Sequence, residues 1–150
     1  MELVIKEATD EEKDWTARLI AGSEPWLTLG TSLETCLRFC HDNEYLVFTA
    51  HLGSLPCGSM VIHPRGLASS PYLKSIVVAS EFRGKKVGSA LLDFAENYFR
   101  ERSKHFFMCV SSFNPRARKL YESLGYKQVG EFPDYIVPGE SEILLHKRIR

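Results

Sequence analysis

An apolar run that leads through a basic, glycine-containing loop into a helical pattern constrains the fold of this chain more than any other feature. The run ends in the apolar residues 76–79, a pattern typical of a strand that is covered on both faces. The loop follows at residues 83–89, and a second apolar run lies beyond the helix at residues 106–111. Because a strand, a helix and a strand in this order usually form a right-handed crossover, we expect the two strands to be parallel.

The rest of the chain alternates between strand and helix patterns. Strands are expected at residues 3–6, 45–51, 57–63, 72–79, 106–111, 126–131 and 142–149. Helices are expected at residues 9–21, 31–40, 87–102 and 114–125. The first two begin at the capping pairs Thr9 with Glu12 and Thr31 with Glu34, and residues 64–71 are expected to form a loop. This order predicts a mixed α/β fold with one parallel strand pair.

Composition restricts the class of protein. The 150 residues, 44% hydrophobic and 25% charged, suit a single globular domain over residues 1–150. The 19 basic and 19 acidic residues cancel, so we expect no nucleic-acid partner. No apolar run approaches the roughly 20 residues of a membrane span, and the N-terminus is too short and acidic for a signal peptide, which favours a cytoplasmic protein without a membrane partner. Cys36, Cys40, Cys57 and Cys109 lack CxxC spacing, which favours free buried thiols over a metal site or a disulfide.

The loop at residues 83–89 has the composition of an anion site. The first amides of a helix lack partners within the helix and carry a partial positive charge, which suits a phosphate. Gly84 and Gly88 would let a ligand approach the backbone closely. Since the chain as a whole is neutral, any phosphate site must be local.

Two motifs in this order resemble those of the GNAT superfamily of acyl-CoA-dependent N-acyltransferases. The family's R/Q-x-x-G-x-G/A motif is matched by Arg83, Gly84, Lys85, Lys86, Val87 and Gly88, with Lys86 where the first glycine usually stands. Its N-x-x-A-x-x-x-Y-x-x-x-G-[FY] motif is matched by Asn114, Ala117, Tyr121, Gly125 and Tyr126. The resemblance implies an α/β fold with a mixed, mostly antiparallel central sheet of about seven strands, about four flanking helices and a diverging parallel strand pair in the centre.

The resemblance also implies roles for single residues. Acetyl-CoA would be the co-substrate, without a metal, and its pantetheine arm would pair with the backbone around Val77 and Val78. Asn114 would hydrogen-bond the same arm, although it also suits a helix N-cap. Tyr121 would be the general acid, and the alternative is an aromatic side chain of the core. The pyrophosphate would bind the backbone amides of Arg83, Gly84, Lys85, Lys86, Val87, Gly88 and Ser89.

In such a reaction a neutral amine attacks the thioester directly, while an amide near Val78 faces the oxyanion. A lysine-type amine, with a pKa of about 10.4, lies about 4.6 kcal/mol from its neutral form at pH 7, whereas an α-amino group lies only about 1 kcal/mol from it. Enzymes of this family that acetylate ribosomal-protein N-termini commonly carry a glutamate on the strand before the asparagine, where this chain has Cys109. Candidate bases are Glu24, Glu81, Asp134 and His63, each of which also suits a solvated surface position.

The expected acceptor is a primary amine on a small molecule or at a peptide or protein N-terminus. Glu24, Trp26, Asp134 and Tyr135 lie in segments outside the cofactor motifs, and their acids and aromatic rings would suit a cationic amine. A CoA-binding module without catalysis stays open as an alternative, as does a homodimer. RNA binding would explain the basic residues near two helix starts, although the neutral net charge argues against it; these residues are Arg83, Lys85, Lys86, Arg116, Arg118 and Lys119.

Overall fold

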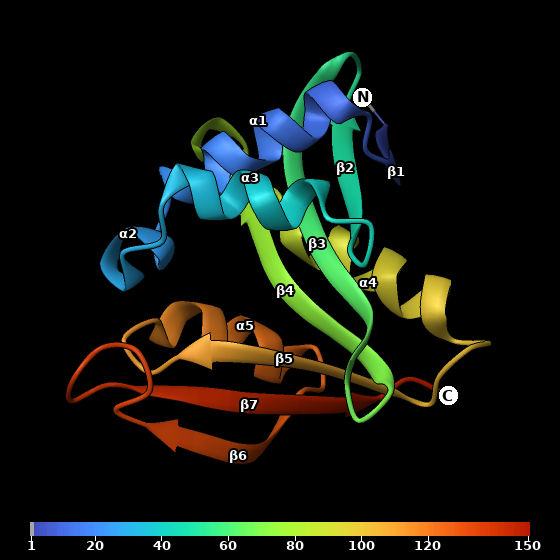
Figure 1. Ribbon diagram of the computed structural model, residues 1–150. Helices are drawn as coiled ribbons and strands as arrows, with labels where there is room; N and C mark the ends of the chain where they lie inside the picture. Colours follow the sequence, from blue (N-terminus) through green and yellow to red (C-terminus); the bar gives the residue numbers. More distant parts are fainter. Residues whose placement is uncertain (1) are drawn as a thin grey trace.

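A computed structural model describes residues 2–150 and arranges seven strands in one sheet (Figure 1). The strands are β1 (Leu3–Glu7), β2 (Leu46–Leu52), β3 (Leu55–Leu67), β4 (Ser70–Val78), β5 (His105–Ser111), β6 (Lys127–Pro133) and β7 (Ser141–Arg148). Their order across the sheet is β1-β2-β3-β4-β5-β7-β6, and only β4 and β5 are parallel. The predicted mixed, mostly antiparallel sheet with a central parallel pair is confirmed.

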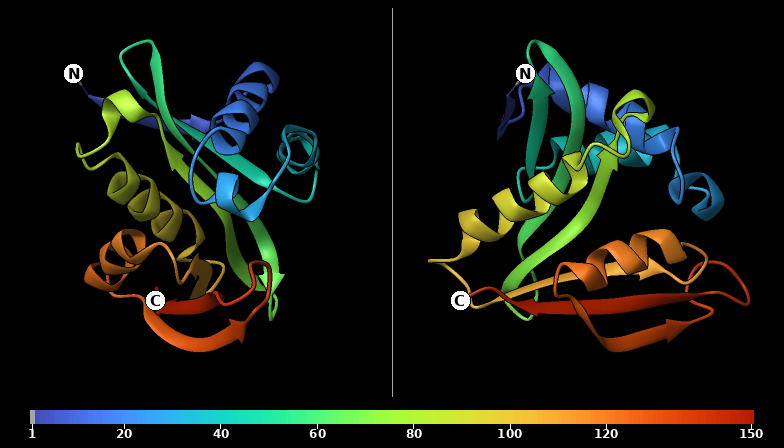
Figure 2. Two further views of the ribbon diagram at one scale, coloured as in Figure 1. Left: turned by 90° about the vertical axis from the view of Figure 1, so that its left-hand side faces the viewer. Right: turned by 180° about the vertical axis from the view of Figure 1, so that it is seen from behind.

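Helices cover both faces of this sheet. They are α1 (Asp10–Ala21), α2 (Trp26–Leu29), α3 (Leu33–His41), α4 (Val87–Phe99) and α5 (Pro115–Ser123), and a single 3-10 turn, Ser80–Phe82, precedes α4. α1 and α3 lie on one face, whereas α4 and α5 lie on the other (Figures 1 and 2). Five helices form where about four were expected, because the break between the first two expected helices contains the one-turn α2.

Two apolar cores result, one on each face of the sheet. The larger core, under α4 and α5, includes Phe48, Leu91 and Phe106, and the smaller core, under α1 and α3, includes Ile20 and Val61. Burial on both faces explains the continuous apolar run at the end of β4, since such a strand has no face that must remain polar.

A β-bulge in β4 separates the two halves of the sheet. Val61 of β3 pairs with Ser75, but the next residue, Ile62, pairs with Leu73, so Lys74 is an extra residue on β4. Such a bulge bends its strand and strengthens the local twist. β4 accordingly pairs with β5 only at Tyr72 and Leu73 and then diverges from it, as Figure 1 shows. The predicted divergence of the parallel pair thus has a local structural cause.

One expectation of the sequence analysis was wrong. Residues 64–71 do not form a loop, because β3 continues to Leu67 and β4 begins at Ser70. Ala68 and Ser69 make the connection with φ values of 49° and 61°, the left-handed conformation of a two-residue hairpin turn that glycine and asparagine usually adopt. Since neither residue carries that turn signal, the hairpin could not be found from local sequence.

Helix capping follows the sequence closely at two of three starts. Thr9 and Glu12 form the expected reciprocal pair at α1, and Asn114 accepts a hydrogen bond from the Ala117 amide at α5. The start of α3 differs, because Ser32, and not Thr31, accepts from the amide three residues later. Two candidate caps stand side by side there, and the helix begins at the second.

The cysteines are free thiols, as expected. Cys36, Cys40 and Cys57 are buried, and Cys109 is partly buried. Burial raises the pKa of Cys40 to about 12 and also raises the pKa of Cys109. With raised pKa values, these thiols stay protonated near neutral pH. Because only the thiolate is an effective nucleophile or metal ligand, neither role is favoured for them.

Candidate functional site

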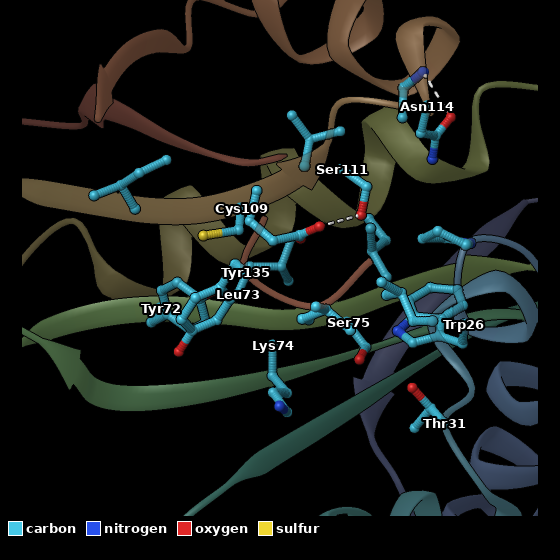
Figure 3. A pocket seen from close by; sticks show the side chains of 18 of the residues that line it. Trp26, Thr31, Tyr72, Leu73, Lys74, Ser75, Cys109, Ser111, Asn114 and Tyr135 are labelled. Atoms are coloured by element: carbon cyan, nitrogen blue, oxygen red, sulfur yellow. Dashed lines mark hydrogen bonds between the residues drawn. The ribbon is translucent and has the colours of Figure 1, made fainter. Parts of the chain in front are cut away.

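A cavity of about 630 Å³ opens where β4 and β5 diverge. Its walls come from the bulged part of β4, the end of β5, the region of α2, the start of α5 and the segment between β6 and β7. Figure 3 shows Tyr72, Lys74 and Ser75 of β4 opposite Cys109 and Ser111 of β5, with Trp26 to one side. A smaller cavity of about 340 Å³ shares Ile76 with it and continues along β4 to Val78 and Arg83. Together the two cavities follow β4 from the bulge to the loop before α4.

The edge of β4 that faces β5 is unpaired beyond Leu73. The Ala79 amide donates to the Cys57 carbonyl of β3 at 2.9 Å. Since backbone groups alternate in direction along a strand, those of Val77 also point toward β3, and those of Ile76 and Val78 point toward the open edge. Of Val77 and Val78, which the sequence analysis named for this edge, Val78 presents its backbone groups to the open side, as does Ile76, whereas Val77 faces β3.

The loop before α4 presents a row of free amides. The Arg83 amide already donates to the Ser80 carbonyl at 3.4 Å. The amides of residues 84–89, by contrast, have no acceptor within residues 2–150. No side chain caps α4, which leaves its N-terminal partial positive charge open to a ligand.

Lys86 departs from the family motif at a position where the backbone explains the usual glycine. Its φ is 64°, in the left-handed region, which disfavours any residue with a Cβ by roughly 1–2 kcal/mol. The Lys86 side chain is exposed. The Lys86 amide makes no hydrogen bond with residues 2–150, so it stays available.

Tyr121 projects from α5 into the larger cavity while its ring packs against the core near Tyr126. The two interpretations of this residue are therefore compatible. Burial raises the pKa of Tyr121 to about 12, so the phenol stays protonated at neutral pH and can donate a proton. Its hydroxyl makes no hydrogen bond with any residue from 2 to 150, which leaves it free for a ligand.

Asn114 also combines two roles. Its side-chain oxygen accepts from the Ala117 amide at 3.4 Å, which caps α5. The residue lines the cavity at the same time, and its side-chain nitrogen points away from the helix in Figure 3. An amide in this position can cap the helix and still donate to a ligand.

The cleft suits a long ligand with a phosphate at one end and amides in its middle. Ser75 is 4% exposed and lines the cavity, yet its hydroxyl oxygen has no partner among the described residues. A buried polar atom without a partner is unusual and points to a missing ligand or water. A Cβ added at Gly88 would meet only the Val78 Cγ2 atom, at 3.9 Å, so packing within the protein does not require glycine there. The free amides, the open edge, Ser75 and Gly88 all fit the pyrophosphate and pantetheine of CoA.

The four candidate bases differ in position. Glu24 lines both cavities, but its two carboxylate oxygens accept from the backbone and side chain of Thr28. Glu81 is exposed and bonded to Ser80, and His63 lies 3.6 Å from the Glu44 carboxylate; neither lines the two cavities.

Of the candidate acceptor residues, the structure brings three to the cavity. Trp26 and Tyr135 line it with Glu24, and the Tyr135 ring lies 5.3 Å from that of Phe132. Asp134 does not line it. The Asp134 carboxylate accepts from the Gly139 amide at 2.5 Å and so stabilises the connection between β6 and β7.

The sequence analysis missed Glu142 and Ser111. Both line the cavity, and the Ser111 hydroxyl donates to the Glu142 carboxylate at 2.7 Å. They pair across β5 and β7, although 31 positions separate them in the chain. No local motif marks either residue, and only the register between the two strands brings them together.

Within residues 2–150, no helix is long and apolar enough to cross a membrane. The same part of the chain contains no group of three His, Cys, Asp or Glu side chains placed to hold a metal ion.

Comparisons with known proteins agree with this geometry. The sequence pattern of the acetyltransferase (GNAT) family matches residues 7–126. An N-acetylaspartate synthetase of Danio rerio is 38% identical over 73 residues, which are 45% of this chain and 24% of that protein. An uncharacterised N-acetyltransferase of Methanocaldococcus jannaschii is 33% identical over 79 residues, which are 51% of each chain. The aligned segments thus span about a quarter to a half of these two relatives.

Solved structures show the same fold over nearly the whole chain. A GNAT-family protein from Desulfovibrio desulfuricans superposes with a TM-score of 0.82 at 14% identity, covering 99% of this chain and 100% of that one. An aminoglycoside 6'-N-acetyltransferase complexed with coenzyme A superposes with a TM-score of 0.78 at 20% identity, covering 98% and 97%. At these identities the likeness concerns the fold alone.

Proposed function

Because the chain belongs to the acetyltransferase (GNAT) family, we propose that it transfers the acetyl group of acetyl-CoA to a primary amine. The acceptor class is an amine on a small molecule or at a peptide N-terminus. The observation that carries the proposal is the pair of cavities along β4, which extend from Arg83, next to the free helix-start amides, to Tyr121. The coenzyme A complex of a structural neighbour supports the choice of co-substrate.

Each part of the cleft then has a task. The amides of residues 84–89 bind the pyrophosphate, since they are unpaired at a helix N-terminus. Ile76 and Val78 offer backbone groups to the pantetheine arm from the open edge of β4. Arg83 Nε donates to the Val78 carbonyl at 3.2 Å. This hydrogen bond must break before the pantetheine arm can pair with that carbonyl.

The bound thioester supplies the acetyl group and a thiolate leaving group. A backbone amide near Val78 stabilises the oxyanion, which is usually a large electrostatic contribution to the rate. Tyr121 donates its phenolic proton to the departing sulfur. With a pKa of about 12, Tyr121 is fully protonated before the reaction and readily takes a proton back after it.

The proposal is tested by measuring thiol release from acetyl-CoA in the presence of a panel of amines. We expect release that depends on the amine and falls at least about tenfold in Tyr121→Phe, because the variant keeps the ring but lacks the acidic proton. Acetyl-CoA binding, measured by calorimetry, should persist in the variant. Tyr98→Phe is the matched control, since Tyr98 packs on Phe48 and lies outside both cavities.

Three results would contradict the proposal in different ways. Tight binding of acetyl-CoA without turnover on any amine indicates a non-catalytic CoA-binding module. Full activity of Tyr121→Phe removes the general acid from the mechanism. Binding of RNA in the absence of CoA binding rejects the function as a whole. One of the basic residues of α5 already has partners within the protein, because Arg118 contacts Glu122 at 3.3 Å and Gln128 at 2.6 Å.

A further inference from the structure

We infer that Glu142, held in place by Ser111, binds the ammonium group of the acceptor and accepts its proton. This inference rests on the proposed acetyl transfer and adds the general base and the acceptor-binding group to it. It also restricts the acceptor to amines that reach the cavity as cations.

The position of Glu142 carries the inference. Glu142 lies at the start of β7, between Ser111 of β5 and Phe132 of β6 in the register of the sheet. All three residues line the cavity that Tyr121 enters. Ser111 is 3% exposed, and its hydroxyl donates to Oε2 of Glu142 at 2.7 Å (Figure 3). The second oxygen, Oε1, has no hydrogen-bond partner among residues 2–150, so one oxygen is anchored and the other is free.

The alternative carboxylate is less suitable. Glu24 and Glu142 are the acidic residues that line the cavity in the described part of the chain. Each oxygen of Glu24 already accepts one hydrogen bond from Thr28, which lies outside the cavity lining. Glu142 has one oxygen that accepts none from residues 2–150, so it offers an ammonium ion the larger unused acceptor capacity.

The surroundings of Glu142 also suit a cation. Tyr135 lines the same cavity beside Phe132, and their rings lie 5.3 Å apart. Aromatic faces attract an ammonium group, especially where water is partly excluded. Burial raises the pKa of Tyr72, and the neighbouring Cys109 and Glu142 contribute to the increase, so Tyr72 presents a neutral hydroxyl to the carboxylate.

The neighbouring strands β4 and β6 each carry a further charged side chain. β4 contributes Lys74, whose ammonium lies over the Phe39 ring at 5.3 Å from its centroid. β6 contributes Glu131, which accepts from the Ser141 hydroxyl at 3.0 Å and lies outside the cavity lining. Of the two acidic residues that line this cavity, Glu142 is the one with an oxygen that accepts no hydrogen bond from residues 2–150.

The proton balance of the transfer is complete with these residues. The ammonium passes one proton to Oε1 of Glu142, which later returns it to water, and the resulting amine nitrogen forms a bond to the acetyl carbon. As the carbon–sulfur bond breaks, Tyr121 gives its proton to the thiolate. The second proton of the nitrogen restores Tyr121. The products are the acetylated amine, the free thiol and one proton in solution.

Glu142→Gln tests the inference, because glutamine keeps the shape and still accepts the Ser111 hydrogen bond but cannot take a proton. Two acceptors are compared by thiol release: n-butylamine, with a lysine-like pKa, and an alanine-initiated peptide, with an amine pKa of about 7.8. At pH 7 we expect kcat/KM for n-butylamine to fall at least about tenfold. The loss of kcat/KM should be smaller for the peptide. For n-butylamine the loss should decrease toward pH 10, because more of this amine is then neutral in solution.

Two further variants separate a chemical role from a structural one. Glu140→Gln is the matched control, since Glu140 also accepts from a serine hydroxyl, that of Ser112, but lies outside the cavity. We expect it to match the wild type at every pH. Ser111→Ala keeps the carboxylate but loses its anchor, so a smaller loss is expected, with the acid side of the pH profile shifted to higher pH because the lost hydrogen bond favoured the ionised carboxylate.

The outcomes are distinguishable from failure of the proposed function. Absence of thiol release from the wild-type protein with both amines contradicts the acetyl transfer itself. Wild-type activity in Glu142→Gln overturns the inference alone. A loss that is equal for both amines and constant from pH 7 to pH 10 also overturns it, because that pattern indicates structural damage.

Discussion

The carboxylate of Glu12 joins the start of α1 to β2. One oxygen accepts from the Thr9 amide at 2.9 Å, and the other lies 2.5 Å from Nε2 of His51. Burial by itself would raise the pKa of Glu12, but the Thr9 amide and His51 outweigh it, and the pKa lies below its usual 4.5. A depressed carboxyl pKa stabilises the folded state wherever the group is ionised.

Glu12→Gln is expected to lower the free energy of unfolding near pH 7 by about 1 kcal/mol, because glutamine can still accept from the Thr9 amide but lacks the negative charge beside His51 and at the start of the helix. The sign follows from the depressed pKa: the contribution of Glu12 is present above about pH 4.5 and disappears as pH falls through the folded pKa. The difference from the wild type should therefore shrink in acid, as measured by urea unfolding over a pH series. A difference that stays constant between pH 7 and pH 3 contradicts this account. Glu11→Gln, at an exposed position of the same turn, is the control.

The start of α4 shows how an element can be shaped by a ligand more than by its own packing. The helix has no side-chain cap, and the residue before it, Lys86, adopts a left-handed conformation. Each feature costs stability compared with an ideal helix start. Gly88 is a third such feature, because glycine disfavours a helix although a side chain would fit at this position. These costs are understandable if the amides must remain open for a phosphate.

Gly88→Val is expected to weaken acetyl-CoA binding at least about tenfold, because a branched side chain would occupy the space through which a pyrophosphate approaches the amides. The free energy of unfolding should not fall, since a Cβ at this position makes only an ordinary contact with Val78 and valine has a better helix propensity than glycine. Calorimetric titration with acetyl-CoA and thermal unfolding of the free protein measure the two effects. Unchanged affinity in the folded variant would remove Gly88 from the binding site.

Across the whole molecule, the sheet behaves as two parts joined at one point. β4 and β5 pair at only two residues, Tyr72 and Leu73 of β4, while α4 and α5 pack on a core shared by both parts. The larger cavity lies beyond these two paired positions, where β4 and β5 diverge. A ligand that pairs with the free edge of β4 would therefore act as an additional strand between the two parts.

Amide hydrogen exchange can detect this pairing at single residues. Addition of acetyl-CoA is expected to slow exchange at Ile76 and Val78, whose backbone groups face the open edge, and at the loop amides of residues 84–89. The Val77 amide should change little, because it already points toward β3. Protection of Val77 without protection of its two neighbours would show that the strand directions inferred for this edge are wrong.

Much of the fold could be predicted from local sequence. Apolar periodicity indicates the strands and helices, and capping residues such as Thr9 and Asn114 mark where two of the helices begin. The two motifs indicated the cleft and placed Tyr121 and Asn114 in it. These features are determined by neighbours a few residues apart, so a single sequence contains the information. Where the local signals were ambiguous, as at Thr31 and Ser32 or at the Ala68–Ser69 turn, the prediction was displaced or wrong.

The tertiary structure decided the rest. The bulge at Lys74, the choice of Ile76 over Val77 at the open edge, and the pairing of Ser111 with Glu142 all depend on strand register. Register is set by how whole faces of the sheet pack against the helices, because a shift of one residue would turn every side chain to the opposite face. Sequence alone thus determined the elements and the cofactor motifs of this protein, whereas only the packed sheet determined which carboxylates line the cavity.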